Sequence, residues 1–84
     1  MTMIHQSAYW FQIQFRDTNR LLARVEEVMD KLGIRYVRTS LCRDRQKEQL
    51  TVNYDSNGPK NKFDSLQEQL IALNGIDGIQ INKQ

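Results

Sequence analysis

The sequence predicts an α+β fold in which two helices cover one face of a four-stranded antiparallel sheet. Four stretches alternate apolar and polar residues, as strands do, and two stretches repeat apolar residues every three or four positions, as helices do. They follow one another in the order strand, helix, strand, strand, helix, strand. Because 84 residues leave room for one hydrophobic core, all of them are expected to belong to a single domain.

The first strand is predicted over residues 8–16, where apolar and polar side chains alternate. Its apolar face consists of Tyr9, Phe11, Ile13 and Phe15. A period of two with aromatic and β-branched residues is typical of a half-buried strand.

The first helix is predicted to follow a short polar stretch. Asp17, Thr18 and Asn19 are all good N-cap residues, and Gly33 stands where a left-handed C-terminal cap favours glycine. Between them the apolar residues recur at helical spacing: Leu21, Leu22, Val25, Val28, Met29 and Leu32.

A β-hairpin is predicted next, because residues 34–43 and 48–55 both favour strands and only a short polar link, residues 44–48, separates them. Leu50, Val52 and Tyr54 share one face of the second of these strands. Residues 56–59, SNGP, predict a turn.

The second helix is predicted to begin near Asn61, with Asp64 completing a capping arrangement. Its inward face consists of Phe63, Leu66, Leu70 and Leu73, and it ends at the Asn-Gly pair at 74–75. A last strand is expected over residues 76–82, with Ile79 and Ile81 on one side.

This order of elements predicts the ferredoxin-like βαββαβ sandwich, an α+β fold with both helices on one face of the sheet. We expect residues 1–7 to be a flexible N-terminal segment or a cloning remnant. Residues 8–84 then form the single domain.

Composition excludes several classes of protein. A net charge of +2 does not by itself favour nucleic acid, and no apolar run approaches the length that spans a bilayer. Cys42 is the single cysteine and His5 the single histidine, so we expect no disulfide within the chain, no metal site and no cofactor. A reducing, cytoplasmic location fits best, and we expect a packing role for Cys42.

The candidate binding site is the junction between the first strand and the first helix. Free backbone N–H groups at a helix start favour an anion, and arginines flank this stretch. We therefore expect any small anionic ligand or amino acid to contact Arg16, Asp17, Thr18, Asn19, Arg20 and Leu21. The alternative is an ordinary helix start, in which one of the three polar residues caps the helix.

The sequence gives weaker support to two other functions. Arg20 and Asn53 resemble the arginine and asparagine of acylphosphatases, but the glycine-bearing phosphate loop of that family is missing. RNA-recognition modules share the predicted topology, and residues 35–47 are basic, yet Trp10 is the only candidate for stacking on a base. We expect neither catalysis nor nucleic-acid binding.

The stretch RDTNRLLARVEEVMDKLGIRYVRTSL, residues 16–41, resembles an ACT domain, the small-molecule-sensing module appended to many metabolic enzymes. The matching positions are Asp17, Leu21, Leu22, Val25, Gly33 and Ile34, and the ending LNGIDGIQI is similar to that of the family. The resemblance spans residues 9–82. It implies a non-catalytic regulatory domain that senses a small ligand or mediates assembly, as a homodimer or with a parent protein.

Arg20 departs from the family pattern, because ligand-binding ACT domains usually have glycine there. A short ACT-like domain without this glycine is similar to the cytoplasmic C-terminal domain of MgtC/SapB membrane proteins, which are linked to magnesium limitation. That resemblance implies a cytoplasmic tail of an inner-membrane protein. The segment itself is expected to make no membrane contact.

Overall fold

The computed structural model describes residues 6–16 and 20–84. The elements are β1 (Gln6–Arg16), α1 (Leu21–Leu32), β2 (Arg35–Asp44), β3 (Gln49–Pro59), α2 (Lys60–Ile71) and β4 (Ile76–Lys83). The predicted order is confirmed. β1 begins two residues before the predicted start, because Gln6 and Ser7 continue the pairing with the end of β3.

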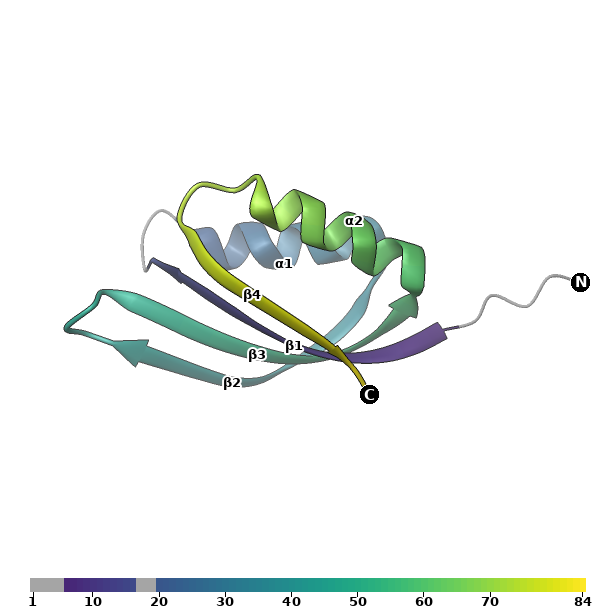
Figure 1. The fold of residues 1–84 in the computed structure, drawn as a ribbon, viewed down its shortest axis with the longest axis horizontal. Helices are drawn as coiled ribbons and strands as arrows, with labels where there is room; N and C mark the ends of the chain where they lie inside the picture. Colours follow the sequence, from purple (N-terminus) through teal and green to yellow (C-terminus); the bar gives the residue numbers. More distant parts are fainter. Residues whose placement is uncertain (1–5, 17–19) are drawn as a thin grey trace, which may run out of the picture.

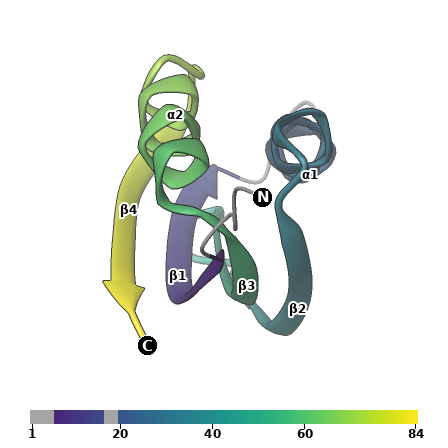
Figure 2. The same cartoon turned by 90° about the vertical axis from the view of Figure 1, so that its right-hand side faces the viewer.

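The four strands form one antiparallel sheet in the order β2-β3-β1-β4. Both helices lie on the same side of this sheet (Figure 1). Seen from the end, α1 covers the β2 side and α2 covers the β4 side (Figure 2). The α+β, ferredoxin-like prediction is therefore confirmed.

The core lies between the sheet and the helices, and the predicted alternation of β1 is confirmed. Phe11 and Ile13 are fully buried on the helix side, opposite Tyr54 and Val52 of β3. The rings of Phe11 and Tyr54 stack with their centroids 5.0 Å apart. From the helices, Val25 and the other buried residues close the core: Leu21, Met29, Phe63, Leu66 and Leu70.

Helix α1 ends as predicted but does not start with a predicted cap. Gly33 adopts φ 73°, and the backbone N–H groups of Gly33 and Ile34 donate to the carbonyls of Asp30 and Met29. The N-cap position is occupied by Arg20, whose side chain makes no capping hydrogen bond. The three predicted caps lie outside the described residues.

The predicted turn at residues 56–59 is wrong, because these residues form the end of β3. They pair with the start of β1, so the chain passes from strand to helix at Pro59, which is the N-cap of α2 in place of Asn61. Gly58 is needed for close packing and not for a turn. A Cβ at this position would meet the Phe63 ring at 3.3 Å.

The β2–β3 hairpin extends beyond the helices at one end of the molecule (Figure 1). Its tip is tightened by Asp44, whose Oδ1 accepts the backbone N–H groups of Gln46 and Lys47 at 3.0 and 3.2 Å. Tyr36 is the one β2 residue that is not exposed. Most of β2 is therefore an uncovered edge strand.

Candidate functional site

The start of α1 carries the predicted binding residues that the structure describes. Arg16 ends β1, and its backbone N–H donates to the Gly75 carbonyl at 3.0 Å. Leu21 is buried, and a Cβ at Gly75 would lie 3.1 Å from its Cδ2 atom. The turn before β4 therefore packs against the helix start. Residues 17–19 lie outside the described part, so their predicted role stays a prediction.

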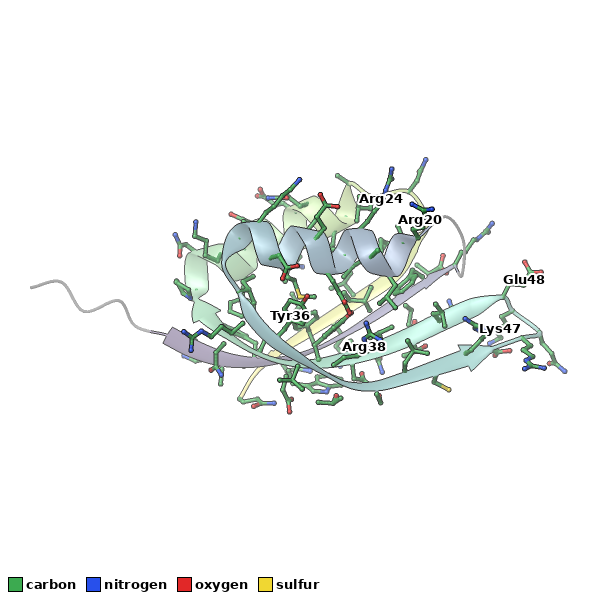
Figure 3. All side chains as sticks on the ribbon, turned by 180° about the vertical axis from the view of Figure 1, so that it is seen from behind. Arg20, Arg24, Tyr36, Arg38, Lys47 and Glu48 are labelled. Carbon is green, nitrogen blue, oxygen red and sulfur yellow. The ribbon has the colours of Figure 1, made fainter. Side chains whose placement is uncertain are left out.

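Arg20 has a backbone conformation that glycine normally adopts. Its φ of 58° and ψ of 31° lie in the left-handed region, which strains residues that carry a Cβ. Its carbonyl accepts the Arg24 N–H at 3.0 Å, which is the first hydrogen bond of the helix. The backbone at Arg20 is thus one that glycine adopts without strain, although the side chain is arginine. The side chains of Arg20 and Arg24 both project from this end of α1 (Figure 3).

A second cluster, which the sequence analysis missed, joins α1 to the β2–β3 hairpin. Glu26 Oε2 accepts hydrogen bonds from Arg38 Nε at 3.1 Å, from Arg38 Nη2 at 2.7 Å and from the Tyr54 hydroxyl at 2.8 Å. Arg38 lies beneath α1 in Figure 3, next to Tyr36. One carboxylate therefore ties together three elements that are distant in sequence.

The pKa values in this cluster are shifted by the surroundings. Burial, reinforced by the hydrogen bond to Glu26, raises the pKa of Tyr54 far above its ordinary value. Burial and the neighbouring Asp30 carboxylate raise the pKa of Tyr36. The hydrogen bond to Glu26 raises the pKa of Arg38. Because Glu26 accepts from a cation and a neutral hydroxyl, the cluster is a satisfied structural tie and not an acid–base pair.

The residues of the acylphosphatase hypothesis are not brought together. Asn53 lies in the middle of β3 and faces away from the helices, where its Nδ2 donates to Ser40 Oγ at 2.6 Å. Its Oδ1 atom is buried without a hydrogen-bond partner among the described residues. Arg20 lies at the start of α1, on the other side of the sheet. A phosphate could not contact both side chains.

The aromatic side chains likewise do not form a platform for RNA. Tyr9, Phe11 and Tyr54 face the helices and are buried, whereas Trp10 is partly exposed on the other face. Stacking of successive bases needs several aromatics on the open face.

Cys42 lies on β2 with an exposed side chain, so the expected packing role is wrong. The reason is that Cys42 pairs with Thr51 and so lies on the face of the sheet that the helices leave uncovered.

No group of His, Cys, Asp and Glu that could hold a metal ion occurs among the described residues. Within the same residues, no helix is long and apolar enough to cross a membrane.

No protein-family model matches the chain, and no curated protein matches it. Solved structures do match. The ACT domain from GTP pyrophosphokinase of Chlorobium tepidum aligns with a TM-score of 0.72 at 14% identity, over 93% of this chain and 100% of that one. The C-terminal domain of the MgtC protein from Mycobacterium tuberculosis aligns with a TM-score of 0.67 at 10% identity, over 100% and 94%.

A homoserine dehydrogenase from Thiobacillus denitrificans aligns with a TM-score of 0.74 at 13% identity, over 95% of this chain. The chain spans only 18% of that enzyme's length. At such identities the likeness shows the fold alone. This chain therefore has an ACT-like, ferredoxin-like fold, which it shares with the ACT domain of a GTP pyrophosphokinase and with the C-terminal domain of an MgtC protein.

Proposed function

We propose that this chain is a non-catalytic, ACT-like regulatory domain that acts by assembly with a second copy or with a parent protein. The observation that carries the proposal is the free outer edge of β2. This strand lies at the edge of the sheet, and no described residue pairs with its outer side. Val37 and Leu41 expose 67% and 43% of their surface there. An unpaired strand with exposed apolar side chains favours pairing with another chain.

The assembly would extend the sheet through β2. The start of α1 lies at the same end of the molecule as the hairpin tip (Figure 3). A ligand bound near Arg16 and Arg20 would therefore lie close to the joined edges. We place the anionic group of such a ligand on the free backbone N–H groups at this helix start.

The first experiment measures mass in solution by light scattering, with a variant that alters the edge alone. Leu41→Lys places a charge on the helix side of β2, and Ile71→Lys makes the same kind of change on α2, where Ile71 is 66% exposed. Pairing through β2 predicts that Leu41→Lys lowers the mass and that Ile71→Lys does not. Equal masses for both variants would contradict pairing through this edge.

The second experiment is a backbone amide NMR titration with amino acids, nucleotides and Mg²⁺. Sensing at the proposed site predicts shifts at residues 16–22 that Arg16→Ala weakens and Arg35→Ala, at the other end of the sheet, leaves unchanged. A titration that shifts no residue of this stretch would remove ligand sensing and leave assembly as the function.

A more specific form of the proposal is the cytoplasmic tail of an MgtC/SapB-type membrane protein. It is favoured by the nearly complete mutual coverage with the MgtC C-terminal domain, 100% of this chain and 94% of that one. An antibody against this domain would then detect a larger protein in the membrane fraction of the native cells. Detection only in the soluble fraction would contradict this form.

A further inference from the structure

The face of the sheet that the helices leave uncovered, called the open face below, has an ordered distribution of charge. Its centre consists of Gln12, Gln14, Thr51, Asn53 and Gln80, as the pairing of β1 with β3 and β4 shows. None of these residues is charged, although charged residues make up 26% of the chain. A surface that lacks charge at its centre has the anatomy of a protein interface.

The charged residues of the open face lie outside this centre. Asp55 pairs with Trp10 on one side of it, and Arg35 lies farther out on the same side, while Asp44 and Arg16 lie at the other end. Consider two copies that pack face to face about a two-fold axis, which lies in the contact plane, runs perpendicular to the strands and passes through the row of Gln12. This axis places one end of the face of each copy opposite the other end of the face of its partner. Arg35 of one copy then lies opposite Asp44 of the other, because β2 crosses over β2. The charges are thus complementary to a second copy of this chain in that orientation.

The same axis brings the Trp10 ring onto a hollow of the other copy. Trp10 lies two residues before the row of Gln12, and Gln14 and its partner Gly78 lie two residues after it. Because Gly78 has no side chain, the surface there is hollowed to about 200 Å³, lined by Gln12, Gln14 and Gln80. The axis therefore places Trp10 of each copy beside the hollow of the other. A tryptophan in a pocket near an interface centre is a frequent source of binding energy.

We propose that the open face is a self-association surface, in which two copies pack face to face with Trp10 of each seated in the hollow beside Gly78 of the other. Four strands and about eight residues along each give a contact of about 500 Å² per copy, from the ordinary strand spacing and rise. The total of about 1,000 Å² is at the low end for specific complexes. The dimer therefore dissociates in the micromolar to millimolar range. This interface is separate from the β2 edge of the proposed function, and both can form at once.

The test is sedimentation velocity from micromolar to millimolar concentration, together with the emission of Trp10, the single tryptophan of the chain. Gly78→Val fills the hollow, and the Cβ would meet only the flexible Gln14 side chain, at 3.3 Å. Gln12→Lys places two like charges beside the axis. Each variant is expected to raise the dissociation constant at least tenfold and to abolish the blue shift of Trp10 emission at high concentration.

Gln67→Lys, on the exposed surface of α2, is the matched control and should leave association unchanged. The amide NMR spectrum shows whether each variant is folded, and Gln80→Lys, at an exposed position, replaces any variant that is not. A monomer at millimolar concentration overturns the proposal. A dimer whose dissociation constant is unchanged by all the open-face variants also overturns the proposal. If Leu41→Lys then abolishes that dimer, the dimer forms through the β2 edge.

Discussion

Removal of the Tyr54 hydroxyl tests the tie between α1 and the hairpin. In Tyr54→Phe the ring stays in the core, where Tyr54 is fully buried and stacks on Phe11. The change deletes only the 2.8 Å hydrogen bond to Glu26. Glu26 keeps both contacts with Arg38, so no charge is left without a partner.

The expected loss of stability follows from the kind of bond. A hydrogen bond to a charged group contributes about 1.5–3 kcal/mol. Because the Glu26 side chain is 21% exposed and water can reach the carboxylate, we expect a value at the lower end, about 1.5–2 kcal/mol. Arg38→Ala should cost less, about 0.5–1 kcal/mol, since the Arg38 side chain is 42% exposed and its ion pair is screened.

The assay is urea unfolding of the two variants and of the double variant, followed by circular dichroism. With a slope of about 1 kcal/mol per molar urea, Tyr54→Phe should lower the midpoint by about 1.5–2 M. Tyr9→Phe is the matched control, because Tyr9 is also buried and the structure gives its hydroxyl no hydrogen bond among the described residues. The double variant should lose more than the sum of the singles, because it alone leaves the Glu26 carboxylate without either donor.

A loss below about 0.5 kcal/mol for Tyr54→Phe, or a loss equal to that of Tyr9→Phe, would refute this reasoning. It would mean that the hydroxyl is as well satisfied by water in the unfolded chain as by Glu26. Strict additivity in the double variant would refute the shared acceptor.

Three further predictions concern the same framework. Folding raises the pKa of Tyr54, so the neutral hydroxyl stabilises the protein fully below the ordinary pKa of about 10, and this stability is lost as the pH rises above that value. When the unfolding midpoint is measured at increasing alkaline pH, it should therefore fall less steeply in Tyr54→Phe than in the unchanged protein. Leu66→Ala empties a fully buried site and should cost about 2–5 kcal/mol, measured by the same unfolding assay, and a cost below 1 kcal/mol would mean that the core collapses to fill the space. Arg20→Gly should raise the free energy of unfolding by up to about 1 kcal/mol, because φ is 58° there, whereas Gly33→Ala should lower it by about 1–2 kcal/mol. A fall for Arg20→Gly together with a rise for Gly33→Ala would show that the left-handed backbone at these positions causes no strain.

The local patterns of the sequence were sufficient for the elements and their order. The alternation in β1 and the leucine spacing of α1 report which side chains face the core, and this depends on neighbours a few residues away. The C-terminal cap at Gly33 was also predicted correctly, because such a cap depends only on the local backbone conformation. The turn prediction at 56–59 was wrong because long-range contacts decide the structure there. Gly58 is required by the side chains of Phe63 and Ile34 that pack against it, and not by a local turn.

The sequence by itself determined the α+β fold, the buried faces of β1, β3 and the two helices, and the position of the basic helix start. Only the tertiary structure decided which residues become neighbours across the sheet. Glu26, Arg38 and Tyr54 carry no shared spacing, and they meet because α1 lies over the β2–β3 hairpin. The uncharged centre of the open face likewise cannot be recognised from the sequence, because its residues come from strands whose register is fixed by long-range backbone pairing.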